Sequence, residues 1–400
     1  MWEQIRANKR NSILLLMLMA AVLGLLGWII GMSVSPDPRA GYFGVGVALI
    51  IWFILAVVSF AGGDAIFLAA SKAVPVTKEV HPQLFDVVEE MAIAAQLPVP
   101  KVYIINDPAP NAFATGRNPQ SASLAVTAGL LGRLNRDELQ GVVGHEMSHI
   151  LNRDILFVTI AGVMLGTITL LSEVFLRGMF YSSMGRRYSS RDRGGGQAQA
   201  IMLLIAILAA ILAPIMATLL YFAISRKREY LADAGSARLT RYPEGLANAL
   251  EKISQNTTQL SVANKVTAPM YIVNPLQKEG MKLSDLTSTH PPISERIKIL
   301  RGMAGASFAD YSDAFSKTTK HATVIPSSAL QDDTAVQIRT GSTQPAESAK
   351  NQARNIGNIM QQVAGFSILT CACGLKMKIP PNFKASQVKC PRCGTVQPIS

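Results

Sequence analysis

Four long apolar stretches divide the chain, with segments of mixed polarity between them. They cover about residues 12–32, 41–60, 155–176 and 198–224. Each is close to the roughly 20 residues that an α-helix needs to cross a bilayer. The first run is too long for the core of a signal peptide, and no clear small-residue cleavage site follows it, so we expect it to be retained. The pattern predicts a mainly α membrane protein with about four hydrophobic helices.

The remaining segments indicate how the chain is divided into domains. Residues 71–154 and 225–311 mix polar and apolar residues, often at helical spacing, as in Val74–Ala95 and Tyr242–Gln255. Two short runs, Val102–Ile105 and Ser123–Thr127, read instead as strands. We expect both segments to form one domain with a small β-sheet, interleaved with the hydrophobic helices. Residues 312–365 are rich in small polar residues, which predicts a largely disordered linker with one helical piece near 346–363.

Composition supports a membrane location and argues against nucleic acid as a partner. Hydrophobic residues make up 49% of the chain, charged residues only 16%, and the mean hydropathy is +0.26. The net charge is +12, and in a membrane protein such an excess usually reflects Lys and Arg at the cytoplasmic ends of helices. There is no phosphate-binding loop and no glycine-rich dinucleotide motif. We therefore expect a lipid bilayer, and no nucleic acid, among its partners.

The candidate chemistry centres on His145-Glu146-Met147-Ser148-His149, an H-E-x-x-H motif after the polar helix start Asn135–Glu138. Positions i and i+4 share a helix face, so His145 and His149 can bind one metal ion, and neutral imidazoles suit zinc. Glu146 would lie beside the metal, where it can act as general base on water. The alternative is a surface helix that carries two histidines by chance.

A zinc site that catalyses a reaction needs a third protein ligand, and Glu229-Tyr230-Leu231-Ala232-Asp233 offers one. Glu229 and Asp233 share a helix face. Glu229 fits the third ligand, and Asp233 fits a carboxylate that accepts the other ring N–H of a ligating histidine. The alternative is an ordinary pair of surface carboxylates.

Two further features are candidates for contact with a substrate. His290, in a Thr-His-Pro-Pro turn, can stabilise an oxyanion, or it can be a capping or structural histidine. Asn111, Ala112 and Phe113 lie between the two predicted strands, where an edge strand could pair with an extended peptide. The alternative is that this segment is simply part of the core.

All four cysteines lie in the last thirty residues, as Cys371-x-Cys373 and Cys390-x-x-Cys393. Two close pairs, each followed by glycine, predict a closed tetrahedral zinc site, so residues 366–400 are expected to form a zinc ribbon. In so small a unit, zinc would supply most of the folding free energy. The alternative, two disulfides, would require an oxidising compartment.

The motifs and their order resemble the HtpX/Ste24 family of membrane zinc metalloproteases. The resemblance covers about residues 1–310 and rests on the segments Asn111–Gly116, His145–His149, Ser225–Asp233 and His290–Pro292. It implies a gluzincin-like catalytic fold, with zinc held by His145, His149 and Glu229 and with Glu146 as base. It also implies endoproteolysis of misfolded or damaged membrane proteins during envelope stress, in the bacterial inner membrane, with the active site facing the cytoplasm. The linker and the ribbon lie outside this pattern.

The orientation of the chain in the membrane leaves two alternatives. A cytoplasmic N-terminus places the metal motif and Glu229 on one side, but it puts the arginine-rich loop from Arg177 to Arg193 outside, against the positive-inside tendency. We prefer this orientation because the reverse would place the basic N-terminus and the basic segment Arg226–Arg228 outside, also against the positive-inside tendency.

The leading function is a zinc endopeptidase that acts on polypeptides. The alternatives are a membrane scaffold with structural zinc sites and, from the Ste24 relation alone, the processing of prenylated proteins; the oligomeric state is not predicted.

Overall fold

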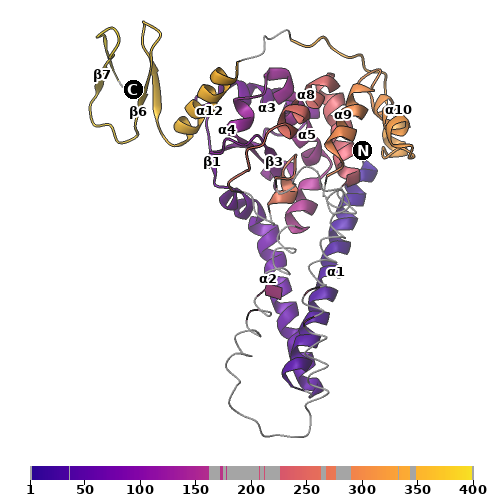
Figure 1. The fold of residues 1–400 in the computed structure, drawn as a ribbon. Coiled ribbons are helices and arrows are strands. Elements are labelled where there is room, and N and C mark those ends of the chain that lie inside the picture. Colours follow the sequence, from indigo (N-terminus) through magenta and orange to yellow (C-terminus); the bar gives the residue numbers. More distant parts are fainter. Residues whose placement is uncertain are drawn as a thin grey trace.

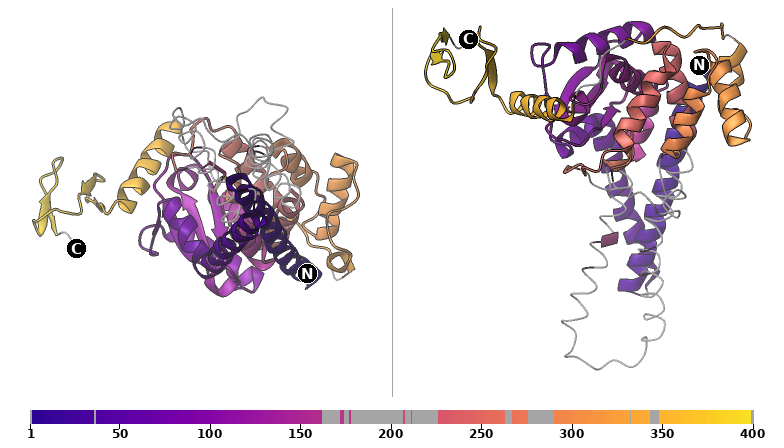
Figure 2. Two further views of the ribbon diagram at one scale, coloured as in Figure 1. Left: turned by 90° about the horizontal axis from the view of Figure 1, so that it is seen from below. Right: turned by 45° about the horizontal axis from the view of Figure 1, so that its top comes forward.

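The computed structural model has a helical head with a two-helix stalk and a small β-unit at its side (Figure 1). The structure describes residues 2–35, 37–161, 226–262, 267–275, 290–331, 333–342 and 348–398, with a few isolated positions between 172 and 211. The third and fourth predicted apolar helices and the arginine-rich loop lie almost entirely outside these ranges. Figure 2 shows that the stalk and the β-unit leave the head in different directions.

The stalk consists of α1 (Trp2–Val34) and α2 (Pro38–Ala70). Both are long and apolar enough to cross a membrane. Only 11% of the most apolar 18-residue stretch of α2 is buried, whereas the core helix of a soluble protein would be mostly buried. Glycines allow the two helices to pack closely, since a Cβ at Gly27 would lie 2.4 Å from the carbonyl oxygen of Gly44. The predicted interruption at Gly62 is a kink with φ of −149°, although α2 continues beyond it to Ala70.

A four-stranded sheet forms one side of the head. Its order is β1-β2-β4-β3, with β1 (Ala73–Pro75), β2 (Lys101–Ile105), β3 (Ala112–Thr115) and β4 (Ser123–Thr127). The central pair β2 and β4 is parallel, and both edge strands are antiparallel to their neighbours. The two strands read from the sequence are confirmed, and β3 lies at an edge of the sheet, as the edge-strand hypothesis requires.

The helical prediction for Val74–Ala95 is only partly correct. The helix α3 covers Pro82–Ala95, while β1 occupies the start of the predicted range. The helix begins at Pro82 because the side chain of His81 caps it, accepting a hydrogen bond from the backbone N–H of Leu84. The apolar face of α3 packs against the sheet and α5 in one continuous core.

The helices that form the rest of the head pack around α5 (Arg136–Leu151). A short α4 (Ala128–Leu131) precedes it, and α5 begins with a capping box between Asn135 and Glu138. Residues 226–240 form a helix that lies beside α5, followed by α8 (Pro243–Ser254) and α9 (Ile293–Arg301). The 3-10 turns η1 (Pro119–Ser121) and η2 (Ala268–Met270) complete the connections.

Residues 312–365 contain more regular structure than a largely disordered linker would. The helices α10 (Phe308–Thr319) and α11 (Ser327–Gln331) pack on the head and bury Tyr311 and Phe315. Residues 333–342 then return along the head, where Arg339 and Ser342 hydrogen-bond the Asp137 carboxylate. Composition alone suggests disorder here because these few anchoring side chains are dispersed among small polar residues. The predicted helical piece is confirmed as α12 (Ala349–Val363).

Beyond α12 the chain forms two small hairpins (Figure 1). The first pairs β5 (Ser367–Thr370) with β6 (Lys376–Ile379), and the second pairs β7 (Gln387–Lys389) with β8 (Val396–Pro398). Few of their side chains are buried, and the small core includes two of the cysteines. Such a unit has too little apolar area to fold by burial alone.

Candidate functional site

The helix α5 and the helix of residues 226–240 bring three predicted metal ligands together. Nε2 of His149 lies 3.2 Å from Nε2 of His145, and the two nitrogens lie 3.5 and 3.6 Å from the two carboxylate oxygens of Glu229. Small residues permit this approach: Gly144 faces Ser236, and Gly235 faces Ser148. The close spacing of i and i+4 histidines, opposed by a carboxylate from a second helix, therefore matches the arrangement expected from the motif.

The donor set and the burial of these side chains fit a zinc ion. His145 and Glu229 are almost fully buried, and Oε2 of Glu229 has no hydrogen-bond partner among the described residues. Burial disfavours the charged imidazole of His145, but the nearby carboxylates of Asp233 and Glu229 outweigh this effect and raise the pKa of His145 to about 9. A pocket that attracts a proton this strongly favours positive charge, and two imidazoles with one carboxylate form a known catalytic zinc donor set.

Glu146 is buried beside the three candidate ligands, as the motif predicts. It is 2% exposed, and burial raises the pKa of its carboxyl, while the nearby His145 and His149 oppose this shift. A backbone hydrogen bond from Ala114 of β3 also favours the carboxylate. A carboxyl group with a raised pKa is a better proton acceptor at neutral pH than an exposed glutamate.

Asp233 lies behind His145, in the position that the sequence analysis predicts. Its Oδ1 is 3.0 Å from Nδ1 of His145, which leaves Nε2 of that ring directed toward His149. Burial raises the pKa of Asp233, but the guanidinium of Arg296 outweighs it and the net shift is downward. Asp233 is therefore held as a carboxylate that can orient His145.

Arg296 is a central residue of the site that the sequence reasoning did not identify. It is fully buried and donates two hydrogen bonds to Asp233, at 2.8 and 2.6 Å. Its Nη1 lies 3.4 Å from Oε2 of Glu229 and donates to the carbonyl oxygen of Ile272. One arginine thus balances two buried carboxylates. The only feature of the sequence that could have indicated its role is that Arg296 is a charged residue on the otherwise apolar face of α9.

Asp154 was also missed, because it follows the end of the metal-binding helix. It is fully buried, and its Oδ2 lies 3.1 Å from Nδ1 of His149. Each histidine of the motif therefore has its own carboxylate, Asp233 for His145 and Asp154 for His149. The feature of the sequence that could have indicated its role is its position, five residues after the second histidine of the motif.

His290 lies next to the candidate ligands. Its Nε2 is 3.6 Å from Oε2 of Glu229, and the residue is 4% exposed. Burial lowers the pKa of His290 to about 4, so the ring is neutral at physiological pH. A neutral imidazole can donate a hydrogen bond from one of its nitrogens. His290 could therefore stabilise an oxyanion or act as a structural donor, and its position agrees with both hypotheses.

The edge strand β3 is only partly free for pairing. The carbonyl oxygen of Ala112 already accepts a hydrogen bond from the backbone N–H of Ile272, at 2.9 Å, and the amide of Asn111 donates to Val273. The ring of Phe113 packs edge-on against Tyr271. The side chains of all three residues are buried, so they form part of the core, as the alternative interpretation of this segment expects. The part of the edge nearest Glu146 begins at Ala114.

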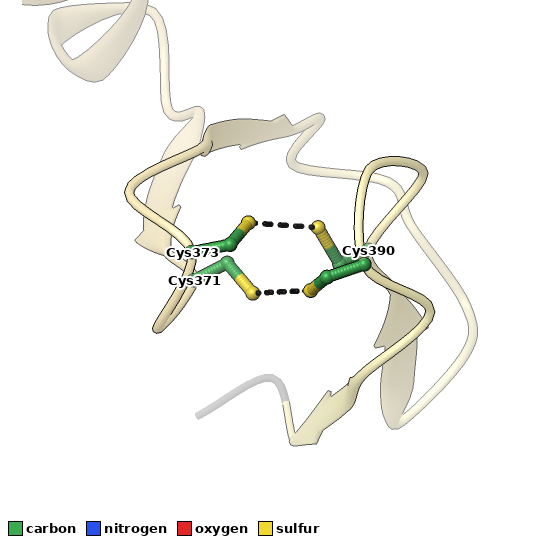
Figure 3. A group of neighbouring side chains, drawn as sticks. Cys371, Cys373 and Cys390 are labelled. Carbon is green, nitrogen blue, oxygen red and sulfur yellow. Dashed lines mark hydrogen bonds between the residues drawn. The ribbon is translucent and has the colours of Figure 1, made fainter.

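The four cysteines form a second cluster in the hairpin unit (Figure 3). Sγ of Cys371 lies 3.4 Å from Sγ of Cys393, and Sγ of Cys373 lies 3.7 Å from Sγ of Cys390. Sulfurs about 3.8 Å apart are expected around a tetrahedral zinc with Zn–S distances of about 2.3 Å. Gly374 and Gly394 have φ of 82° and 76°, which close tight turns after each pair. Thr395 lowers the pKa of the Cys393 thiol to about 6.

Comparison with known proteins identifies the family. The model of peptidase family M48 matches residues 78–304. A protease HtpX homolog of Dictyoglomus thermophilum is 46% identical over 302 residues, which are 76% of this chain and 94% of that protein. A protease HtpX homolog of Streptococcus pneumoniae is 44% identical over 303 residues, 76% of this chain and all of that protein.

The Ste24p structure of S. mikatae aligns with 74% of this chain and 66% of that chain, at 19% identity and a TM-score of 0.40. The sequence relatives and the family model carry the assignment. Since the family model covers more than half of the chain and includes His145, His149 and Glu229, this chain belongs to peptidase family M48.

Proposed function

We propose that the protein is a membrane-bound zinc-dependent endopeptidase. The observation that carries this proposal is the convergence of His145, His149 and Glu229 around one point, with the carboxylate of Glu146 buried beside them. A purely structural site needs no such carboxylate, and it would normally be closed by a fourth protein ligand. Among the described residues, only three side chains form this group.

The residues divide the chemistry between them. His145, His149 and Glu229 would hold zinc, which in an open site acidifies water and polarises a carbonyl group. Glu146 accepts the proton of the attacking water and delivers it to the leaving amine. Asp233 and Asp154 hold the two imidazoles in the tautomer that directs Nε2 toward the shared point. His290 donates a hydrogen bond to the developing oxyanion.

The substrate is a polypeptide that binds in extended form beside β3. The edge segment of Asn111, Ala112 and Phe113 leads to Ala114, whose backbone hydrogen-bonds Glu146. A peptide that extends the sheet from Ala114 onward would therefore place a scissile bond next to the proposed base. The names of the relatives, protease HtpX homolog, support proteolysis.

The stalk and the charge pattern support a proposal for the location of the protein. We propose residence in the bacterial inner membrane, with the head in the cytoplasm and misfolded or damaged membrane proteins as substrates. The basic residues before the apolar run of α1 support a cytoplasmic N-terminus. The head lies at that end of α1, as the N-terminal label in Figures 1 and 2 shows.

The proposal is tested with Glu146→Gln in the full chain, purified in detergent. The variant keeps the size of the side chain but cannot accept the proton, so cleavage of an unfolded model polypeptide such as casein should fall by about 10²-fold or more. Zinc content should stay at the wild-type value because Glu146 is not a ligand. Glu244→Gln, an exposed glutamate on α8, is the control and should cleave normally.

Two outcomes would contradict the proposal. Cleavage by Glu146→Gln at the wild-type rate would show that another group is the base. A wild-type protein that holds zinc through His145, His149 and Glu229 but cleaves no polypeptide would favour a membrane scaffold with structural metal sites.

A further inference from the structure

The first turns of α1 are attached to the head through specific polar contacts. Glu3 accepts a hydrogen bond from the hydroxyl of Ser328 on α11, at 2.8 Å. Asn8 is only 2% exposed, although it lies among the charged residues before the apolar run. Its amide donates to the carbonyl oxygen of Asn152 at 2.7 Å and to Oδ1 of Asp154 at 2.6 Å. Both amide protons are therefore used by the turn that follows α5.

The backbone conformation of that turn places Asp154 next to His149 of the metal-binding helix. Arg153 has φ of 62°, which is uncommon for a residue other than glycine. The helix α5 ends at Leu151, and the carbonyl oxygen of its cap residue, Asn152, accepts a hydrogen bond from the Asn8 amide. The reversal at Arg153 then places the Asp154 carboxylate against Nδ1 of His149, at 3.1 Å.

Asp154 also contacts the segment that carries the third candidate ligand. Nε of Arg228 lies 3.6 Å from Oδ1 of Asp154, and Arg228 immediately precedes Glu229. The guanidinium of Arg228 stacks over the ring of Phe157, 3.5 Å from its centroid. Phe157 in turn packs in an apolar cluster with Leu15, Met19 and Leu23 of α1. Polar and apolar contacts thus join α1 to both halves of the site.

We propose that α1 is a structural part of the metal centre as well as a membrane anchor. Asn8 fixes the Asp154 carboxylate, and Asp154 fixes the tautomer and ring orientation of His149, so the position of the first membrane helix sets the geometry of the ligand set. Asn8 and Asp154 are positioning residues that act through His149. Partners of this kind usually change metal affinity by about 10–100-fold when they are removed. The inference rests on the proposed metal site.

The test measures metal binding in the full chain with Co²⁺ as the probe. The thiolate site gives an intense sulfur-to-cobalt charge-transfer band, whereas a site of two histidines and one carboxylate gives only weak visible bands. The two sites can therefore be titrated separately in one sample against a competing chelator. Asn8→Ala should weaken Co²⁺ binding at the histidine site about tenfold and leave the thiolate site unchanged.

The matched control is Ser12→Ala. Ser12 lies one turn further along α1, is also buried, and its hydroxyl donates only to the carbonyl of Asn8 among the described contacts. Its loss should leave Co²⁺ affinity unchanged. If Ser12→Ala weakened the histidine site as much as Asn8→Ala, a general loosening of α1 would explain the effect, and the specific role of Asn8 would be wrong.

A double-variant cycle separates positioning from general stability. Asp154→Asn should weaken the histidine site, and combining it with Asn8→Ala should add little, because Asn8 acts through Asp154. Additive losses would overturn the proposed chain of contacts. If thermal unfolding shows that Asn8→Ala does not fold, Asn8→Ser provides the comparison, because serine keeps a polar side chain that is too short to make both contacts of the Asn8 amide.

The outcomes also distinguish this inference from the proposed function. If wild type binds no Co²⁺ outside the thiolate site, or if His149→Ala binds it as wild type does, the metal site itself is wrong. If wild type binds and His149→Ala does not, while Asn8→Ala equals wild type, only the role of α1 is overturned.

Discussion

At the residue scale, Arg296 is a fully buried cation that contacts two carboxylates of the site. It is fully buried between Asp233 and Glu229, so Arg296→Ala would leave Asp233 without its main counter-charge and would also remove a cation close to Glu229. Removing one partner of a buried ion pair costs about 3–5 kcal/mol, because the remaining charge stays desolvated. We expect a large drop in the midpoint of thermal unfolding of the detergent-solubilised, metal-free protein.

Arg301 provides the control on the same helix. It pairs with Glu244 and Glu251 but is 39% exposed, and surface pairs contribute about 1 kcal/mol or less. Arg301→Ala should therefore shift the midpoint much less. Equal shifts for the two variants would mean that the buried charges near Arg296 are compensated in another way.

The residues of the site differ in how far the sequence could reveal them. His145, Glu146 and His149 form one local motif, and Glu229 and Asp233 share one helix face, so helical spacing predicts the grouping within each helix, while the chemistry of a zinc site suggests that the two groups meet. Arg296 and Asp233 are 63 positions apart, and only tertiary packing makes them partners. A single sequence has no periodic signal for such a pair.

At the element scale, the packing of α5 against α8 depends on a glycine. A Cβ at Gly141 would lie 2.5 Å from the backbone nitrogen of Leu246, and backbone atoms cannot move aside cheaply. Gly141→Ala should force the helices apart and destabilise the fold by about 1–3 kcal/mol, as overpacking does. The midpoint of thermal unfolding of the detergent-solubilised protein measures the effect.

Gly357→Ala in α12 is the comparison, because a Cβ there meets nothing within 4 Å. Alanine is a better helix former than glycine, so this change should be neutral or stabilising by up to about 1 kcal/mol. The packing argument would be contradicted if both alanine variants unfolded at the wild-type temperature.

Elements with a strong local signal were predicted well. The strand Ser123–Thr127 and the helix that carries the H-E-x-x-H motif agree with the structure, because a short apolar run specifies the strand and capping residues specify the start of the helix. The strand β1 was missed because three residues carry no detectable period, and its pairing with β2 is tertiary. The order in residues 312–342 was missed because it comes from side-chain contacts with distant parts of the head, such as Arg339 with Asp137.

At the scale of the whole molecule, the two candidate metal sites lie in parts of the chain that have different hydrophobic cores. The histidine site lies in the head, within the residues that match the family model, whereas the cysteine cluster lies beyond residue 304 at the far end of α12. The contacts of α12 with the head run through its apolar face, where Ile356 and Ile359 are buried. Loss of one metal should therefore leave the other site intact.

Zinc content and cleavage measured together test this independence. Wild type should hold two zinc ions per chain, and Cys390→Ser should hold one and still cleave casein, since the head folds around its own core. His149→Ala should also hold one, retained by the cysteines, and should not cleave. A Cys390→Ser protein that lost both ions and all cleavage would show that the head depends on the ribbon. A wild-type protein with no free thiols and no zinc in its tail would instead carry the two disulfides that the cysteine spacing also allows.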